Sequence, residues 1–152
     1  MDPRPASIAE LREAASTIFS MQDLKSLIWV GVHCHFAYSE QDEPPSGGHN
    51  DDVDIVTVWD PNTYGAWRSR YVDRHIHLEQ RLHQAWKREI YPLDITEGKL
   101  SDNRHTDAML CSRTIYGSAQ DQLVTKLRKE ARAVVDQELD FCVRVSRKIK
   151  EV

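Results

Sequence analysis

The sequence predicts one small domain of the mixed α/β (α+β) class, with helices flanking a small mixed sheet and a long C-terminal helix. Four segments repeat apolar residues three and four positions apart, a spacing typical of amphipathic helices. Three shorter segments are rich in β-branched and aromatic residues, as strands are. The 152 residues suit a single domain, with a core over about 8–117 and a C-terminal helix over about 118–152.

The first helix is expected to run from Ser7 to about Met21. Its start is a capping box, S-I-A-E, in which Ser7 and Glu10 satisfy each other's free backbone N–H groups. The segment SLIWVGVHCHFAY, residues 26–38, is expected to be a strand because it is short, apolar and β-branched. Residues 39–50 contain two prolines and two glycines and predict a loop.

The rest of the chain predicts two further strands and three helices. The second strand is expected from Asp52 to Trp59, and Asp60-Pro61 ends it. The remaining expected elements are a long helix over about 63–90, a strand over 90–96, a helix over about 102–115 before Gly117, and a final helix over about 119–150. The final helix keeps an amphipathic pattern along its length, which predicts a packing or dimerisation arm.

Composition and charge exclude several classes of protein. The net charge of −4 argues against a protein that coats nucleic acid, although a nucleic acid remains a conceivable acceptor in a reaction. Three widely spaced cysteines form neither a C-x-x-C zinc pattern nor a disulfide framework, which favours a reducing compartment. No apolar run reaches the roughly 20 residues of a membrane span, and the first residues show no secretory leader. We therefore expect a cytoplasmic protein without membrane contacts.

Two aspartates on the second strand form the first candidate site. In DDVDIVTVW, Asp52 and Asp54 are two residues apart, so their side chains share one face of the strand. Two carboxylates about 4 Å apart repel by roughly 4 kcal/mol at an effective dielectric constant of about 20. A hard cation such as Mg²⁺ or Mn²⁺ relieves that repulsion, and Asp94 in YPLDIT is the candidate for a third ligand. The alternative is that these aspartates are ordinary polar residues at the start of a strand.

Histidines at the end of the first strand form the second candidate site. His33 and His35 share a strand face, where they can supply a general base, bind a metal ion or line a nucleotide pocket. An ordinary polar strand face is the alternative. Arg68, near the start of the long helix, is a candidate for a phosphate contact.

The order of these motifs resembles that of the DNA polymerase beta-type nucleotidyltransferases, and within them the minimal nucleotidyltransferases. The resemblance covers about residues 8–117 and consists of a strand ending in glycine, a loop, Asp-x-Asp on a strand, a helix, and a third Asp on a strand. DDVDIVTVW is similar to the family's metal-binding strand and YPLDITEGKL to its third strand. MLCSRTIYG, residues 109–117, is similar to its closing helix.

This resemblance implies transfer of a nucleotide from a nucleoside triphosphate to an unknown acceptor. Mg²⁺ or Mn²⁺ would be held by Asp52, Asp54 and Asp94, and the phosphates would lie over Gly31 and Val32. The family has Gly-Ser at these two positions. This chain keeps the glycine as Gly31 but has Val32 in place of the serine, so it lacks the serine hydroxyl. Two alternatives follow: a nucleotidyltransferase-fold binding or partner protein without transfer activity, and an enzyme that uses the site on another small molecule.

The final helix is the expected partner surface. Antitoxin-like minimal nucleotidyltransferases pair with helical toxins, so the resemblance implies a helical partner for residues 119–150, or a second copy of the chain. A nucleotide is the small molecule that the resemblance implies.

Overall fold

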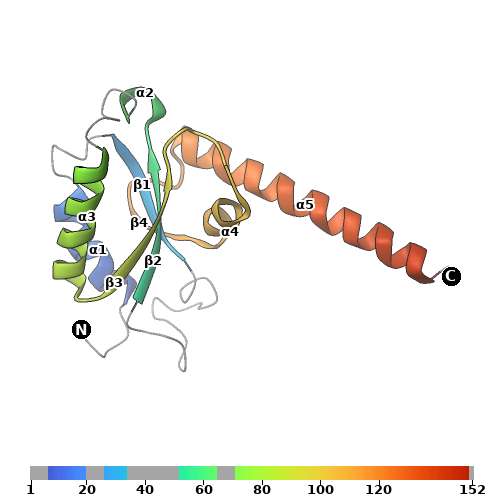
Figure 1. Ribbon diagram of the computed structural model, residues 1–152, viewed down its shortest axis with the longest axis horizontal. Coiled ribbons are helices and arrows are strands. Elements are labelled where there is room, and N and C mark those ends of the chain that lie inside the picture. The colour runs from blue at the N-terminus through green and yellow to red at the C-terminus, as the bar shows by residue number, and fades with distance from the viewer. Residues whose placement is uncertain (1–6, 20–25, 34–51, 65–70, 151–152) are drawn as a thin grey trace.

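The computed structural model describes residues 7–19, 26–33, 52–64 and 71–150. They form a four-stranded mixed sheet with helices on both faces, and one long helix extends away from the sheet (Figure 1). The strands are β1 (Leu27–Val32), β2 (Asp52–Trp59), β3 (Glu89–Ile95) and β4 (Arg113–Tyr116). The predicted class, a small mixed sheet with flanking helices and a long C-terminal helix, is confirmed.

The strand order is β3-β2-β1-β4. β1 is antiparallel to both β2 and β4, whereas β2 and β3 are parallel. The last residues of β1 and the first residues of β2 and β3 therefore lie at the same end of the sheet. Among the described candidates, Asp52, Asp54 and His33 lie at this end.

The sheet is covered on both faces because its central strands are apolar on both sides. On one face, α1 (Ile8–Phe19) and α3 (Tyr71–Trp86) pack against the strands; on the other, α4 (Asn103–Cys111) and the first turns of α5 (Gln122–Lys150) do so. The first core contains Ile8, Leu11, Val32, Val53, Ile55, Leu82 and Trp86, and the second contains Trp29, Val56, Val58, Ala108, Met109, Val124 and Leu127.

The segment expected as one helix over 102–115 is a helix followed by a strand. Asp102 caps α4, its side chain accepting hydrogen bonds from the backbone N–H groups of Arg104 (2.8 Å) and His105 (3.1 Å). The helix ends at Cys111, and β4 then pairs with the free edge of β1. The edge of β1 supplies the hydrogen-bond partners that make an extended conformation favourable here, and neighbouring sequence does not encode them.

The other elements lie close to their expected positions. The capping box forms as predicted, with Glu10 N donating to Ser7 Oγ at 3.2 Å and Ser7 N donating to Glu10 Oε2 at 3.1 Å. β2 has the expected bounds. The helix expected over 63–90 is represented by the short α2 (Pro61–Tyr64) and by α3, with residues 65–70 outside the described part of the chain. β3 begins at Glu89, one residue earlier than expected.

Among the helices that the structure describes, none combines the length and apolarity that crossing a membrane requires.

We predict that Gly117→Ala destabilises the fold more than Gly98→Ala does. Both glycines have a left-handed backbone, with φ of 76° and 70°, which costs a side-chain-bearing residue roughly 1–2 kcal/mol. At Gly117 an added Cβ would also lie 2.2 Å from the carbonyl oxygen of Ile28, whereas at Gly98 its nearest neighbour would be Pro61 Cγ at 3.3 Å. The difference between the free energies of unfolding of the two variants, measured with urea, gives the cost of the backbone clash. Equal losses of stability would contradict the close approach at Gly117.

Candidate functional site

The parallel pairing of β2 and β3 brings acidic residues together at one end of the sheet. Asp52 pairs with Glu89 and Asp54 pairs with Tyr91. Residues paired across parallel strands share a face, and so do residues two apart in one strand. These four positions therefore lie on the face covered by α4 and α5, beyond the apolar pairs Val56–Leu93 and Val58–Ile95. Glu89 is the acid that the sequence reasoning missed, because the strand was expected to begin after it.

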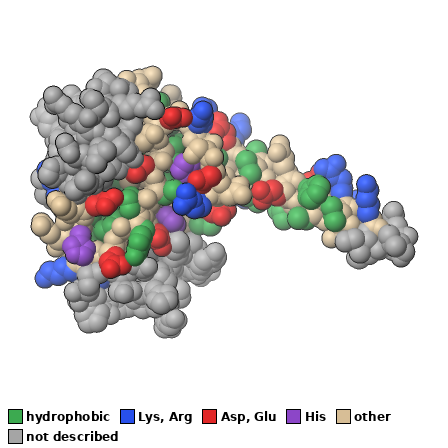
Figure 2. Space-filling view, viewed as in Figure 1, with side chains coloured by type: hydrophobic (Ala, Val, Ile, Leu, Met, Phe, Trp, Pro, Cys, Tyr) green, Lys and Arg blue, Asp and Glu red, His purple; other side chains and the backbone are tan. Residues whose placement is uncertain are grey.

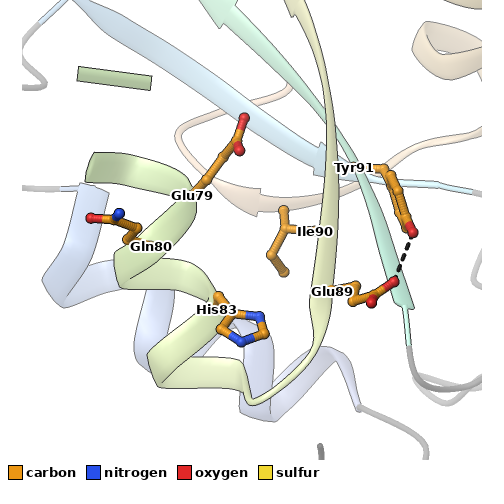
Figure 3. Close-up of a pocket in the computed structure, with 6 residues that line it drawn as sticks. All are labelled: Glu79, Gln80, His83, Glu89, Ile90 and Tyr91. Carbon is orange, nitrogen blue, oxygen red and sulfur yellow. Dashed lines mark hydrogen bonds between the residues drawn. The ribbon is translucent and has the colours of Figure 1, made fainter. Parts of the chain in front are cut away.

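Glu89 and Tyr91 form an exposed pair on the outer strand of the sheet. The Tyr91 hydroxyl donates to Glu89 Oε2 at 2.7 Å, as Figure 3 shows. A pocket of about 360 Å³ lies against β3 here and is lined by Glu79, Gln80, His83, Glu89, Ile90 and Tyr91. The Tyr91 side chain is 51% exposed, so both its ring and the Glu89 carboxylate can be reached by a ligand.

His33 lies beside Asp54 where β1 ends. Its backbone N–H donates to the carbonyl oxygen of Asp54 at 3.0 Å, which continues the β1–β2 ladder past Val32 and Ile55. Burial lowers the pKa of the His33 imidazole below its ordinary value, and the nearby Asp54 carboxylate opposes this shift without reversing it. A histidine with a lowered pKa is mostly neutral at pH 7 and can accept a proton.

The structure does not bring Asp94 to the other two aspartates, so the expected set of three acids is corrected. Asp94 pairs with Thr57, three residues along β2 from Asp54 and on the opposite face of the sheet. The fully buried Thr57 hydroxyl donates to Asp94 Oδ1 and accepts a hydrogen bond from Trp59 Nε1 at 2.8 Å. Asp94 therefore belongs to a polar chain inside the fold. Glu89 is the acid that the register places next to Asp52.

Gly31 and Val32 have structural reasons for their identities. A Cβ at Gly31 would lie 2.4 Å from Trp29 Cη2 and 2.6 Å from Ser112 Cβ, so only glycine fits beneath these side chains. Val32 is fully buried in the core formed with α1 and α3, on the face away from Asp54. Its side chain therefore cannot take the place of a phosphate-binding serine on the acidic face.

A basic pocket lies between α4 and α5 and includes Ser112, the residue that lies against Gly31. It has a volume of about 340 Å³ and is lined by Met109, Leu110, Ser112, Arg128, Lys129 and Arg132. The Arg128 guanidinium lies 5.2 Å from the Trp29 ring centroid, and its Nη2 donates to the Ser112 carbonyl oxygen at 3.2 Å. Among the described residues, Arg128 Nε is buried without a hydrogen-bond partner. Burial lowers the pKa of Arg128, yet the group stays charged at neutral pH.

The sequence carries a weak signal for this pocket. Arg128, Lys129 and Arg132 lie within one and a half turns of an otherwise amphipathic helix. The position of Arg128 over Trp29 of β1 depends on the packing of α5, which the local sequence does not specify.

Several candidate residues lie outside the described part of the chain. These are His35, Arg68 and the loop 39–50, and the structure describes the backbone of Asp52 but not its side chain. Among the side chains that are described, no three His, Cys, Asp or Glu groups gather closely enough to hold a metal ion. The catalytic and metal-binding roles of all these candidate residues stay predictions.

Comparison with solved structures identifies the fold. A toxin–antitoxin structure with AMP-PNP matches with a TM-score of 0.52 and 12% identity, covering 89% of this chain and 98% of the other. A mutant of the MntA–HpeT toxin–antitoxin pair matches with a TM-score of 0.50 and 10% identity, covering 93% and 99%. A tri-AMPylated Shewanella oneidensis HEPN toxin in complex with its MNT antitoxin matches with a TM-score of 0.50 and 11% identity, covering 91% and 98%.

No protein-family model matches the sequence, and no curated protein matches it. The structural matches show that the chain has the nucleotidyltransferase fold, which confirms the fold that its motifs imply.

We predict that Thr57→Val lowers the free energy of unfolding by about 1–3 kcal/mol, because it removes a buried hydroxyl that bonds both Asp94 and Trp59. Thr125→Val, on an exposed part of α5, is the matched control and should change stability by less than about 0.5 kcal/mol. Urea unfolding measures both variants. If the Thr57→Val protein is as stable as the parent, the structural role of the Thr57–Asp94 hydrogen bond is contradicted.

We predict that the His33 imidazole titrates below 6.5, and lower still in Asp54→Asn, because the carboxylate that favours the charged ring is gone. The contribution of neutral His33 to the free energy of unfolding is complete above pH 6.5. It is lost as the pH falls from 6.5 through the lowered pKa of the folded protein. NMR titration of the ring, assigned with His33→Gln, gives the pKa in both proteins. A higher pKa in Asp54→Asn would contradict the proximity of the two groups.

Proposed function

We propose that this chain transfers a nucleotide from a nucleoside triphosphate to a hydroxyl group, with the help of Mg²⁺ or Mn²⁺. The observation that carries the proposal is the strand register, which assigns Asp52, Asp54 and Glu89 to one face at one end of a nucleotidyltransferase fold. Mg²⁺ and Mn²⁺ prefer carboxylate oxygen ligands, so these acids suit such an ion. Asp94 is left out of the proposed metal site, because it lies on the other face and bonds the buried Thr57 hydroxyl.

The ion would be held by Asp52, Asp54 and Glu89. When bound, it would neutralise charge on the phosphate oxygens and stabilise the departing pyrophosphate. The Tyr91 hydroxyl, which donates to one Glu89 oxygen, limits the orientations of that carboxylate and leaves the other oxygen free for a ligand.

His33 is the proposed general base. Its lowered pKa keeps the ring neutral at pH 7, and it lies beside Asp54. It would accept the proton of the acceptor hydroxyl as that oxygen bonds to the α-phosphorus, while the bond from that phosphorus to the pyrophosphate oxygen breaks. His35 is kept as a second candidate for this role.

Arg128 is the proposed phosphate ligand in place of the missing serine hydroxyl. Its pocket includes Ser112, which lies against Gly31 of β1. Gly31 is two residues, or about 7 Å, before His33 along the strand. Charged guanidinium groups pair well with phosphate oxygens, and Arg128 has a donor group without a partner among the described residues. Gly31 serves this arrangement by admitting Trp29 and Ser112, and Arg68 stays a further candidate.

The acceptor is proposed to be a side-chain hydroxyl of a protein, and the nucleotide to be ATP. One structure with the same fold contains AMP-PNP, and another pairs an MNT antitoxin with an AMPylated toxin. These descriptions support the proposal by analogy of fold.

A second candidate function is a nucleotidyltransferase-fold binding or partner protein without transfer. The observation that favours it is Val32, whose side chain is buried on the wrong face for phosphate binding. Such a protein can bind a nucleotide without a metal ion, or bind only its partner.

We predict that Asp54→Asn weakens Mn²⁺ binding at least about tenfold, a loss of about 1.4 kcal/mol, because it removes a charged oxygen ligand. Glu89→Gln should weaken it less, and Asp94→Asn should leave it unchanged while lowering stability. Isothermal calorimetry of Mn²⁺ with and without AMP-PNP measures all three against the parent.

The set of variants also separates the candidate functions. Metal-dependent nucleotide binding that Asp54→Asn abolishes supports transfer, whereas nucleotide binding that needs no metal ion supports the binding module. If Asp94→Asn weakens Mn²⁺ binding as strongly as Asp54→Asn does, the assignment of the metal-binding acids from the strand register is incorrect.

A further inference from the structure

The basic pocket contains one cation that the fold holds in place and two that are exposed. Lys129 and Arg132 are exposed, like the Lys and Arg side chains that Figure 2 shows near the far end of the same helix. Arg128 is half-buried, and its guanidinium carbon lies 5.2 Å from the centroid of the Trp29 ring. A guanidinium at this distance from an aromatic face makes a cation–π interaction. Arg128 is therefore the cation of this pocket whose position the core specifies.

The Trp29 ring is itself fixed by the strand next to β1. Trp29 is fully buried, and its Nε1 donates a hydrogen bond to Thr114 Oγ1 at 2.9 Å. Across the β1–β4 ladder, Thr114 is the partner of Gly31, so the ring extends along β1 toward the Gly31–Thr114 pair. A buried ring with its N–H group bonded offers the guanidinium a surface with one orientation.

Gly31 makes this position of the ring possible. A Cβ at Gly31 would lie 2.4 Å from Trp29 Cη2 and 2.6 Å from Ser112 Cβ, closer than carbon atoms approach without a bond. The ring and Ser112 therefore share the space above the glycine. Both of them contact Arg128, since the Ser112 carbonyl oxygen accepts a hydrogen bond from its Nη2 at 3.2 Å.

These contacts leave the terminal nitrogens of Arg128 available to a ligand. A guanidinium has five N–H donors, one on Nε and two on each terminal nitrogen. Nε is buried, and the Ser112 carbonyl oxygen takes one donor of Nη2. Among the described residues, no second acceptor bonds this side chain. Neighbouring N–H groups of the two terminal nitrogens match two oxygens of a phosphate group.

A cation that is already held in place binds a ligand at a lower cost in entropy. A mobile arginine or lysine gives up rotamer freedom when it binds, whereas the side chain of Arg128 is ordered by the ring and by Ser112 before any ligand arrives. Lys129 and Arg132 attract an anion through charge, an effect that salt screens. The pocket thus combines one oriented donor group with two exposed charges.

We propose that Trp29 and Thr114 are positioning residues that hold the Arg128 guanidinium for a pyrophosphate group in the basic pocket. The inference rests on the proposed function, since it takes the phosphate chain of the nucleotide as the ligand of Arg128. It adds that recognition depends on the orientation of one cation and not only on the sum of three charges. Gly31 then acts through the Trp29 ring, without touching the ligand.

Calorimetry of the full chain with inorganic pyrophosphate, in the absence of a metal ion, tests the proposal. Arg128→Lys should weaken binding at least about tenfold, because lysine keeps the charge but lacks the planar fork. Trp29 belongs to the core, so its orientation is changed through Thr114 instead. Thr114→Val removes the hydrogen-bond acceptor and should weaken binding at least about threefold. Thr114→Ser keeps the acceptor and should restore the affinity of the parent. Circular dichroism establishes that each variant folds.

Salt separates positioning from charge. Thr114→Val changes no charge, so its loss of affinity relative to the parent should be the same in about 0.05 M and about 0.5 M KCl. Lys129→Gln removes an exposed charge, so it should weaken binding at the lower salt concentration and have little effect at the higher one.

A parent chain that does not bind pyrophosphate would overturn the proposal, whereas the acidic site is tested separately by Mn²⁺ binding in Asp54→Asn. Pyrophosphate binding that Arg128→Lys or Thr114→Val leaves unchanged would overturn it too, and nucleotidyl transfer would then need another phosphate ligand, such as Arg68. Equal losses of affinity in Thr114→Val and Thr114→Ser would contradict the role of the Trp29–Thr114 hydrogen bond.

Discussion

The register between β2 and β3 is the constraint on which the rest of the structure depends. Successive residues of a strand face opposite sides, so a shift of one residue would exchange the two faces completely. The register is held by apolar packing on both sides, with Val53 and Ile55 against α1 and α3, and Val56 and Val58 against α4 and α5. The same packing therefore decides where the acids lie. It places Asp54 and Glu89 on one face and Asp94 on the other.

The short strand β4 links the sheet to everything that follows it in the chain. Its pairing with β1 sets Ser112 above Gly31, and the Ser112 carbonyl oxygen accepts a hydrogen bond from Arg128. Arg128 in turn packs over Trp29, so the start of α5 is fixed against the acidic face. One continuous helix thus supplies the proposed phosphate ligand and, beyond its last fully buried residue, Ala131, a stretch from 136 to 148 in which every residue is exposed.

Local signals in the sequence predicted most of the elements. The capping box at Ser7 and Glu10, the alternation in 52–59 and the stripe of the final helix each act over a few neighbouring residues, and each prediction agrees with the structure. The motif order also led to the nucleotidyltransferase fold, since strand and helix order are encoded along the chain. The sequence predictions that failed are those that depend on which strands pair with each other. Residues 113–115 were expected at the end of a helix and instead belong to β4, because the edge of β1 supplies their hydrogen-bond partners.

The sequence by itself determined that Asp52 and Asp54 share a strand face, because that depends only on the alternation of one strand. It also determined the apolar stripe of the final helix, because that depends only on the spacing of neighbouring residues. Only the tertiary structure decided that Glu89 rather than Asp94 lies on the same face as the aspartates, and that Arg128 packs over Trp29. These are contacts between residues far apart in the chain. Their geometry depends on register and helix packing, which arise only when the whole core forms.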